Sequence, residues 1–322
     1  MHFKIQIEQL IVHRDIEKIS ARNPVVTVGI FDGVHLGHQY IIEKLIAAAR
    51  ERDGESVVVT LWPHPREVLN HSTNGVRLIT TLREKEKILS QFAIDHMVIL
   101  AFTREFSQQS YCDFVSGILV EKLSINHLIM GFNHRFGKNR EGNIENIRKC
   151  ASQYNFTVDH LEPFIDGGRH ISSSVIRQVL SEGDIKQANK YLGYPFMLSG
   201  KVSGGSKVGR SIGFPTANII PDDPRKLIPG VGVYAVEVII NDQVHKGMLN
   251  IGTRPTVNTN PDKTTIEVHI IDFDGDIYGQ NIGLRFINRI RDEMKFGSVE
   301  ELRLQLIKDK KITLELLYPG KD

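Results

Sequence analysis

The stretch from Thr27 to His38 places the strongest constraint on what this chain can fold into. Residues 25–30 form an apolar, mostly β-branched run, which is typical of a strand covered on both faces. The run ends in a glycine-containing turn, and residues 39–52 then repeat apolar side chains at helical spacing. The order of strand, tight turn and helix predicts the start of an α/β fold.

The turn also has the features of an anion-binding site. Gly29, Gly33 and Gly37 let the backbone approach a ligand. The helix that begins near Gly37 offers unpaired N–H groups and the positive end of its dipole, so we expect a phosphate chain here. His35 and His38 lie three residues apart at the helix mouth, where both imidazoles can donate hydrogen bonds to charge that develops on an α-phosphoryl group.

The histidine pair has two other possible interpretations besides a phosphate site. A helical zinc motif has histidines at positions i and i+4 next to a glutamate. This pair has the spacing i and i+3, and no glutamate is next to it. The pair can also be incidental to a turn. The glycines and the preceding strand favour the phosphate site.

The residues of this turn resemble a known signature. The string His35-Leu-Gly-His38 is similar to the HxGH signature of the nucleotidylyltransferase superfamily, and the longer string from Gly29 to Gln39 resembles its FAD synthetase branch. The resemblance implies that His35 and His38 are catalytic. It also implies that the ATP-binding residues of the turn are Gly29, Phe31, Asp32 and Gly37.

Size and composition limit the possible functions. A chain of 322 residues suits two domains better than one core, and 41% hydrophobic with 24% charged residues is ordinary for a globular protein. A net charge of +2, without runs of Lys or Arg among aromatic residues, argues against nucleic-acid binding. Two cysteines without a C-x-x-C motif, no signal-like segment and no apolar stretch of about twenty residues predict a cytoplasmic protein with no membrane span.

The rest of the N-terminal half continues the α/β alternation. We expect strands at residues 56–61, 95–101, 125–131 and 157–160, and helices at residues 81–92, 112–123 and 144–155. This order predicts a Rossmann-like domain, a parallel sheet with right-handed crossovers. The strand at 56–61 ends in Trp62-Pro-His-Pro-Arg66, and because ligands gather at the carboxyl ends of strands, Trp62, His64 and Arg66 should lie near the first turn. Trp62 and Arg66 are candidate flavin-binding residues, although a proline-stiffened connector explains the segment equally well.

A second loop at a strand end runs from Gly131 to Gly142 and forms the expected second wall of a nucleotide site. Its cations Arg135, Lys138 and Arg140 suit a triphosphate, although a solvated basic loop is an equally good explanation. The loop resembles the G-x-[ND]-F-x-F-G motif of FAD synthetases, which implies that Asn133 binds ATP. His134 departs from this motif, in which Phe is usual.

Three successive serines precede an apolar-periodic run near the end of this half. Ser172, Ser173 and Ser174 are ordinary candidates for helix capping. Together with Arg169 and Arg177 they also suit the phosphates that leave as pyrophosphate. The segment resembles the I-S-S-T-x-I-R motif of the same family, with Ser174 in place of Thr.

From Met197 the composition changes to β-branched runs separated by Gly, Pro, Asn and Asp. The expected strands are residues 197–202, 217–220, 232–240, 245–250, 264–273 and 282–286, which predict a small antiparallel β-barrel. A final helix at residues 298–309 should pack against the barrel or cap it. We place the boundary between domains 1–184 and 185–322.

Two segments of the C-terminal half have features of a nucleotide site. Gly204–Ser211 nearly forms a Walker A loop, but Arg210 stands where Lys is needed and no helix follows, so we reject that interpretation. In the next segment, Thr216 and Asn218 alternate on one side of an extended chain and present oxygens that suit Mg²⁺ bound to ATP. Taken alone, this segment is also explained as a turn before a strand.

The segment around Thr216 resembles the PTAN motif of riboflavin kinases, and matching strings follow in order over nearly the whole remaining chain, among them Asn250–Thr256. The resemblance implies that Glu267 deprotonates the ribityl hydroxyl as general base. An alternative for Glu267 is the solvent face of an edge strand. The other implied roles are Mg–ATP binding by Gly209, Thr216 and Asn218, and flavin binding by Asn250, Arg291 and Asp292.

In this order, the whole chain resembles the bacterial bifunctional riboflavin kinase/FAD synthetase family. The resemblance implies that the barrel phosphorylates riboflavin with ATP, giving FMN and ADP, and that the N-terminal domain joins AMP to FMN, giving FAD and pyrophosphate. Both steps are expected to use Mg²⁺ and no covalently bound cofactor. Two alternatives are another nucleotidylyltransferase with an unrelated accessory domain, such as a pantetheine-phosphate or glycerol-phosphate enzyme, and a flavin-binding regulatory protein, which the departures at His134, Ser174 and Tyr194 leave open.

Overall fold

A computed structural model describes residues 10–14, 16, 19–69, 75–138, 141–166, 168–204, 208–253 and 264–317. Arg140 and the end of the Asn250–Thr256 string lie outside these residues. The chain divides into two compact units. The first contains Met1–Val76 and Leu82–Ser172, and the second contains Arg77–Thr81 and Ser173–Asp322.

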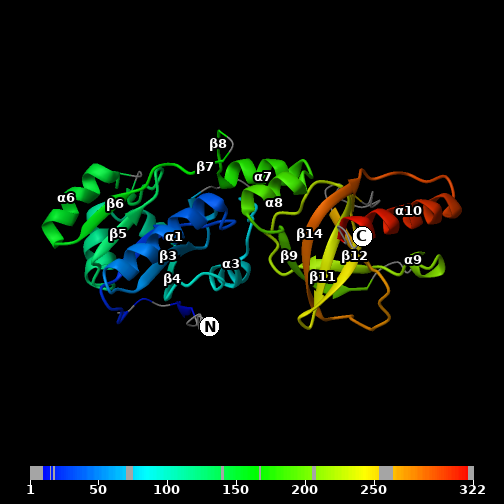
Figure 1. Cartoon of the computed structure of the whole chain (residues 1–322), viewed down its shortest axis with the longest axis horizontal. Coiled ribbons are helices and arrows are strands. Elements are labelled where there is room, and N and C mark those ends of the chain that lie inside the picture. Colours follow the sequence, from blue (N-terminus) through cyan, green and yellow to red (C-terminus); the bar gives the residue numbers. More distant parts are fainter. Residues whose placement is uncertain are drawn as a thin grey trace, which may run out of the picture. The chain divides into compact units, whose positions relative to one another are not determined.

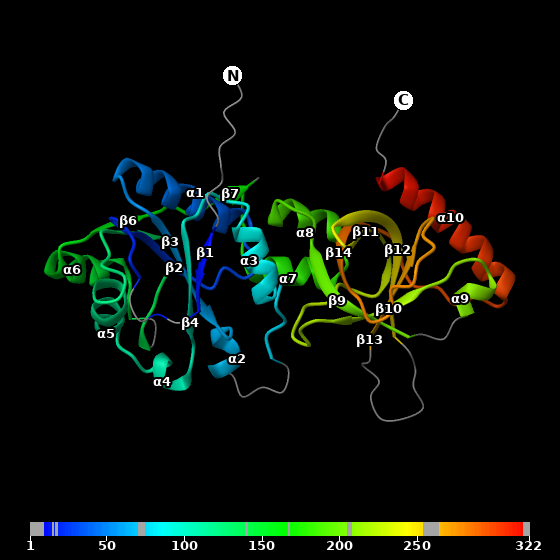
Figure 2. The same ribbon diagram turned by 90° about the horizontal axis from the view of Figure 1, so that it is seen from below.

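The first unit is built on a six-stranded parallel sheet, coloured blue to green in Figures 1 and 2. Its strand order is β1-β4-β3-β2-β5-β6, and each pair of neighbours is parallel. This confirms the predicted parallel sheet, to which the short edge strand β1 adds a strand that the sequence did not predict. The strands are β1 (Ile11–His13), β2 (Val25–Gly29), β3 (Ser56–Trp62), β4 (His96–Ala101), β5 (His127–Met130) and β6 (Thr157–His160).

Helices cover both faces of this sheet. On one face, Val26 and Val57 belong to a buried cluster with residues of η1 (Val115–Val120) and α6 (Ile144–Tyr154). Because successive strand residues point to opposite faces, the equally buried Val25 and Val58 face the other side. There α1 (Leu36–Glu51) contacts β2, β3 and β5. Burial on both faces explains why these strands are apolar without interruption.

The remaining elements of the first unit are short. They are α2 (Pro65–Leu69), α3 (Leu82–Leu89), α4 (Arg104–Ser107), α5 (Tyr111–Phe114), β7 (Ile165–Asp166) and β8 (Arg169–His170). The single helix expected at residues 112–123 is instead α5 followed by the π-helix η1, in which Glu121 N donates to Ser116 O at 2.9 Å. A π-helix changes the hydrogen-bond register but not the apolar pattern, so periodicity does not reveal it.

The strand order reverses between β2 and β5. β3 and β4 lie on one side of β2, whereas β5 and β6 lie on the other, and Thr27 Oγ1 bridges the reversal by donating to Ile129 O at 3.0 Å. Open α/β sheets bind ligands outside the carboxyl ends of their strands at such a point. The turn after Gly29 and the loop after Met130 therefore flank the expected ligand site.

The second unit contains the predicted antiparallel barrel, which is closed with the order β10-β13-β12-β11-β14-β9. Pairing of β9 with β10 closes it. All six expected strands are present, and the helices α7 and α8 precede them in the chain. The elements are α7 (Ser173–Ser181), α8 (Ile185–Leu192), β9 (Met197–Ser203), α9 (Val208–Ser211), β10 (Ala217–Pro221), β11 (Gly232–Ile240), β12 (Gln243–Thr253), β13 (Thr264–Ile270), β14 (Asn281–Arg291) and α10 (Val299–Leu317).

The C-terminal helix α10, red in Figure 2, packs on the outside of the barrel. Leu306 and Leu314 of α10 contact a small buried cluster that includes Met248 of β12. Asp309 of α10 is fully buried and accepts hydrogen bonds from Arg291, at the end of β14, at 2.8–3.1 Å. The helix therefore continues past Asp309, where the sequence pattern had ended it.

A short segment from the N-terminal half of the sequence belongs to the second unit. Leu78 N donates to Arg225 O and Leu227 N donates to Leu78 O, both at 2.8 Å. The buried Lys226 Nζ donates to Ile79 O at 2.5 Å. This segment makes the compact units discontinuous in sequence, and the domain boundary after residue 184 stays a prediction.

None of the helices in the described part of the chain is long and apolar enough to cross a membrane.

Candidate active sites

The histidine-bearing turn joins β2 to α1 at the reversal of the sheet. His35 is the N-cap residue of α1 in an extended conformation, and its side chain makes no capping bond. The ring of His35 stacks on that of His38, with centroids 3.7 Å apart and an interplanar angle of 19°. A Cβ on Gly37 would approach the His35 ring to 3.2 Å, so a glycine at this position lets the rings stack at the helix mouth.

Burial and neighbouring groups affect the charge of His38. His35 is 5% exposed, and the edge of Phe31 packs against His38 at 5.2 Å between ring centroids. Burial lowers the pKa of His38 well below 6.5, and the neighbouring His35, His134 and Lys85 lower it further. His38 is therefore a neutral hydrogen-bond donor at physiological pH, which suits stabilisation of a transferring phosphoryl group.

The loop after β5 meets this turn. Gly131 N donates to His134 Nδ1 at 3.4 Å, and the His134 ring lies 6.5 Å from that of Phe31. A Cβ on Gly29 would lie 2.8 Å from the Phe31 ring and 3.0 Å from His134 Nε2, so a larger residue at position 29 would collide with these side chains. Burial, helped by His160, lowers the pKa of His134 to about 4, so this histidine packs as a neutral aromatic ring.

The polar residues of the same loop lie on the surface. Asn133, Arg135 and Lys138 are exposed and can reach solvent or a ligand. Their predicted roles in binding ATP stay predictions.

The end of β3 lies on the other side of the turn. Trp62 lies 5.9 Å from Lys85 Nζ, measured to its ring centroid. His64 is buried and its Nδ1 accepts from Arg66 N at 3.1 Å, while the Arg66 side chain is exposed. This arrangement agrees with the expected position of the segment at the carboxyl edge, and flavin binding by Trp62 and Arg66 stays a prediction.

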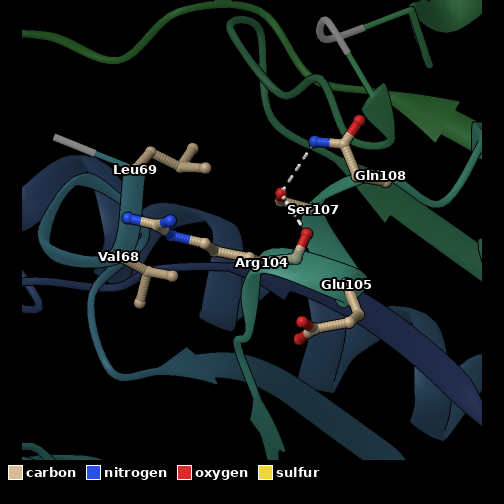
Figure 3. A pocket seen from close by; sticks show the side chains of 6 residues that line it. All are labelled: Val68, Leu69, Arg104, Glu105, Ser107 and Gln108. Carbon is tan, nitrogen blue, oxygen red and sulfur yellow. Dashed lines mark hydrogen bonds between the residues drawn. The ribbon is translucent and has the colours of Figure 1, made fainter.

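A cavity of about 360 Å³ opens between α2 and α4, which follow β3 and β4. Figure 3 shows the Arg104 side chain extending toward Val68 and Leu69. None of the residues predicted from the sequence lines it. The lining residues are Val68, Leu69, Arg104, Glu105, Ser107 and Gln108.

The serine string begins next to the histidine turn. Ile171 O would lie 3.8 Å from a Cβ on Gly37, so the backbone just before Ser172 reaches the start of α1. Arg169 lies in β8. Ser173, Ser174 and Arg177 belong to α7 of the second unit, where Arg177 Nε donates to Arg77 O at 2.8 Å. Their contacts with pyrophosphate stay predictions.

In the second unit, strand register brings the predicted kinase residues into one row. Asn218 of β10 pairs with Glu267 of β13, which pairs on its other side with Asn250 of β12. Directly paired residues share a face of the sheet. Asn250 shares its face with Met248, two residues away on β12, which packs with α10, so the row lies on the outside of the barrel.

The row and the neighbouring Thr216 together present three kinds of oxygen. Thr216 Oγ1 donates to Glu267 Oε2 at 3.4 Å, and Thr216 is exposed while Glu267 is half-buried. Asn218 Nδ2 is buried and has no hydrogen-bond partner in the described chain. Rotation of the amide group can turn either its N or its O toward a ligand. A hydroxyl, an amide and a carboxylate side by side fit the hard-oxygen chemistry of Mg²⁺.

The three remaining kinase-site predictions lie around this row. Gly209 packs against the backbone of Phe214, where a Cβ would collide with Phe214 O. Arg291 is engaged with the buried Asp309, and its neighbour Asp292 is exposed and pairs with Arg289 at 2.9 Å. Binding of ATP by Gly209 and of flavin by Asn250, Arg291 and Asp292 stays a prediction.

Sequence reasoning missed two charged residues of these sites. Lys85 is buried beside the histidine turn, and a helical pattern that places it with Ile88 and Leu89 could have shown this. Glu293 reaches the site of the barrel, because a Cβ on Gly252 would meet its carboxylate and approach Asn250 Nδ2 to 3.1 Å. No sequence period applies to Glu293, which follows the last strand. Within the described ranges, no three His, Cys, Asp or Glu side chains are grouped as ligands of a metal ion.

The fold and the two sites define the class of protein. A parallel sheet with a glycine-rich, histidine-bearing turn at its reversal is a nucleotide-binding architecture. The barrel adds a second site of hydroxyl, amide and carboxylate groups. The chain is thus a two-domain transferase with one site in each unit.

Comparisons with known proteins identify the family. The family model described as FAD synthetase matches residues 17–175, and that described as riboflavin kinase matches residues 192–317. The bifunctional riboflavin kinase/FMN adenylyltransferase of Escherichia coli (strain K12) is 37% identical over 88% of this chain and 90% of that protein. The protein of the same name from Listeria monocytogenes is 38% identical over 90% of this chain and 91% of that protein. The chain belongs to the bifunctional riboflavin kinase/FMN adenylyltransferase family.

A solved structure extends the likeness of fold over nearly the whole chain. A crystal structure from Streptococcus pneumoniae, named Macrolide-efflux Protein, has a TM-score of 0.85 and 31% identity, and covers 94% of this chain and 98% of that chain. Its name carries no activity over to this chain. The match of both halves, in order, to one family removes the alternative of an adenylyltransferase with an unrelated accessory domain.

Proposed function

We propose that the second unit transfers the γ-phosphoryl group of ATP to riboflavin, and that the first unit joins AMP from a second ATP to the FMN so formed. The first reaction releases ADP and the second releases pyrophosphate. The low net charge and the two cysteines without a C-x-x-C motif favour work in the cytoplasm on these small molecules, without nucleic-acid or membrane partners.

Glu267 is the proposed general base of the kinase reaction. It takes the proton of the ribityl hydroxyl as that oxygen attacks the γ-phosphorus, and the bond to the β–γ bridging oxygen breaks. The observation that carries this role is the row Asn218–Glu267–Asn250, with Thr216 Oγ1 at 3.4 Å from the carboxylate. A half-buried carboxylate in that row can meet a substrate hydroxyl, whereas an edge strand open to solvent would leave it without neighbours.

Thr216 and Asn218 are the proposed Mg–ATP residues. Mg²⁺ is commonly held by one or two carboxylates together with substrate phosphates, so a few protein oxygens suffice. When bound, the ion would neutralise the charge that develops on the phosphates. The unpartnered amide of Asn218 supports the assignment, because a buried polar atom that bonds nothing in the free protein is ready to bond a ligand.

His35 and His38 are the proposed stabilisers of adenylyl transfer. A phosphate oxygen of FMN attacks the α-phosphorus of ATP, and the bond from that phosphorus to the pyrophosphate oxygen breaks. The stacked imidazoles of the buried His35 and the half-buried His38, at the N-terminus of α1, can donate hydrogen bonds to the oxygens of the α-phosphoryl group, and no covalent intermediate is required.

Time-resolved flavin analysis tests the whole proposal. The purified chain is incubated with riboflavin, excess ATP and Mg²⁺, and the flavins are separated by chromatography over time. We expect FMN to appear first and then to give way to FAD. Persistent FMN would contradict the adenylyltransferase assignment, and unchanged riboflavin would contradict the kinase assignment. Unchanged riboflavin together with unchanged supplied FMN would favour a flavin-binding protein without activity.

A further inference from the structure

The turn that carries the catalytic histidines has a strained backbone. Phe31, Gly33 and Val34 have φ values of 49°, 84° and 34°, in the left-handed region. Glycine adopts this region freely, whereas for a β-branched residue such as Val34 it is a conformational outlier. Such a conformation persists only where the surrounding structure fixes it, and it is typical of functional sites.

Hydrogen bonds fix the turn at both of its ends. At the start, the carbonyl of Ile30 accepts from Lys85 Nζ at 2.6 Å and from Thr60 Oγ1 at 3.1 Å. Lys85 Nζ also lies 3.2 Å from Thr60 Oγ1. At the end, Gln39 Nε2 donates to the carbonyl of Val34 at 2.9 Å. Both lone pairs of the Ile30 carbonyl are thus used by side chains from two other elements, β3 and α3.

Lys85 is an unusual residue to find in this place. It is 2% exposed, and burial lowers the pKa of its ammonium to about 8, although the charges of Asp32 and Glu86 act in the opposite direction. Burying an ammonium group is costly, and Thr60 shows that a neutral hydroxyl can hold the same carbonyl. A role in the site accounts for a lysine at this position better than stability of the fold does.

We propose that Lys85 is a positioning residue for adenylyl transfer, which holds the Ile30 carbonyl and thereby fixes the turn that aims His35 and His38 at the nucleotide. This inference rests on the adenylyltransferase function proposed for the first unit. Its own burial keeps Lys85 from contacting the substrates directly. Its effect is on geometry, and its cation also acts on His38, whose pKa it helps to lower.

The physical consequence is a selective effect on the chemical step. Phosphoryl and adenylyl transfers depend mainly on the position of charged and hydrogen-bonding groups, and a displacement of about 1 Å can cost on the order of 100-fold in rate. A loosened turn would misplace the histidine donors in the transition state. Ground-state binding of ATP and FMN, which depends on other contacts, would change little.

The test compares two lysines of the same helix in the full-length chain. Lys85→Met removes the buried ammonium and keeps the length of the side chain, whereas Lys87→Met removes an exposed ammonium two residues away on α3. Steady-state kinetics with supplied FMN and Mg–ATP give kcat and KM for FAD formation. For Lys85→Met we expect kcat to fall by roughly 10- to 100-fold with KM for both substrates nearly unchanged. Lys87→Met should match the wild type, and FMN formation by both variants reports on folding of the second unit.

A second variant keeps the inference testable if Lys85→Met does not fold. Thr60→Val removes the other donor to the Ile30 carbonyl at nearly constant size, and it should lower kcat by a smaller factor. In the double variant the loss should be less than the product of the two single losses, since both donors act on one carbonyl.

Specific results would overturn the inference. They are an unchanged kcat in Lys85→Met, a higher KM with unchanged kcat, or, where only Thr60→Val folds, an unchanged kcat in that variant. If the wild type itself makes no FAD from FMN, it is the proposed function that fails.

Discussion

The site proposed for adenylyl transfer in the first unit takes its residues from one turn, whereas the site proposed for the kinase reaction in the second takes them from three strands. His35 and His38 lie three residues apart in sequence, and their stacked rings are held at the end of a strained turn. Asn218, Glu267 and Asn250 are far apart in sequence and meet through barrel register. In the first site burial lowers the pKa of His38, whereas the second site contains a half-buried carboxylate, Glu267.

This difference shows how each site can fail. The first site depends on local backbone geometry, so changes in the groups that hold the turn should disturb it. The second depends on pairing, because a slip of one residue in β13 would move Glu267 to the barrel interior. Since the two proposed sites lie in different compact units, the activity of the unmutated unit shows whether the effect of a substitution is confined to one unit.

The largest effect is expected from substitution of the proposed general base, Glu267, which should remove one activity and leave the other. Glu267→Gln keeps the shape of the side chain but removes the group that accepts a proton, so FMN formation should fall by about 10²- to 10⁴-fold. Conversion of supplied FMN to FAD should stay near the wild-type rate. Glu237→Gln is the matched control, because Glu237 is another half-buried barrel carboxylate that pairs with Arg285 at 3.0 Å. Equal loss of both activities in Glu267→Gln would contradict the assignment of two separate sites.

The reciprocal change tests the buried turn. His38→Ala removes one donor of the stacked pair, so FAD formation should fall by about 10²- to 10³-fold and the reaction should stop at FMN. His13→Ala is the control, since His13 lies in edge strand β1 and its Nε2 bonds His96 Nδ1 at 3.0 Å, away from the turn. FAD production at the wild-type rate by His38→Ala would mean that the turn is not the site of adenylyl transfer.

The histidine-bearing turn of the first site was easier to predict from sequence than the hydrogen bonds that hold it in place. The strand, the glycine turn and the helix were predicted because apolar periodicity and glycine spacing are local signals, and β2 and α1 begin within a few residues of the expected positions. The hydrogen bonds from Lys85 and Thr60 to the Ile30 carbonyl join three segments that are separate in sequence, so no local sequence pattern predicts them. Their only sequence signal is the place of Lys85 on the apolar side of α3.

In the second site the strands could be predicted from sequence, but the arrangement of the site residues could not. Its strands were predicted from β-branched runs, but their register, which places Asn250 beside Glu267, is a property of long-range pairing. The final helix was expected to end at Asp309. Asp309 is instead buried and pairs with Arg291. Burial of a carboxylate within a helix cannot be predicted from sequence unless the residue that pairs with it is known.

A smaller effect concerns nucleotide binding in the barrel. Asn218→Ala should raise the KM for ATP in FMN formation by roughly 10- to 100-fold, since a hydrogen bond to a charged group contributes about 1.5–3 kcal/mol. The melting temperature should change little, because the Asn218 Nδ2 has no partner to lose in the described chain. Asn189→Ala is the opposite control: its amide bonds both Phe286 O and Phe196 N, so the variant should lose stability and keep its KM. A lower melting temperature with unchanged KM in Asn218→Ala would assign this residue to the fold.

The smallest expected effect concerns pH and the unusual histidine of the first site. The pKa of His134 is about 4 in the folded chain, below the ordinary value of 6.5, because burial disfavours its charged form. As pH falls below about 6.5, the unfolded chain therefore binds a proton at this residue before the folded chain does. The folded state loses stability through the window from about pH 6.5 to about pH 4, and it loses no more from this group below that window.

His134→Phe removes this titration and keeps a ring of similar shape against Phe31. The drop in melting temperature of the first unit between pH 7.5 and pH 5 should be smaller in the variant than in the wild type. It should not vanish, because the pKa of His38 is also lowered by burial and His38 still titrates. FAD formation at pH 7.5 should be retained, since the neutral His134 acts there as an aromatic ring. An unchanged pH dependence would mean that His134 is not buried as a neutral group, and lost activity would mean that its nitrogens take part in the site.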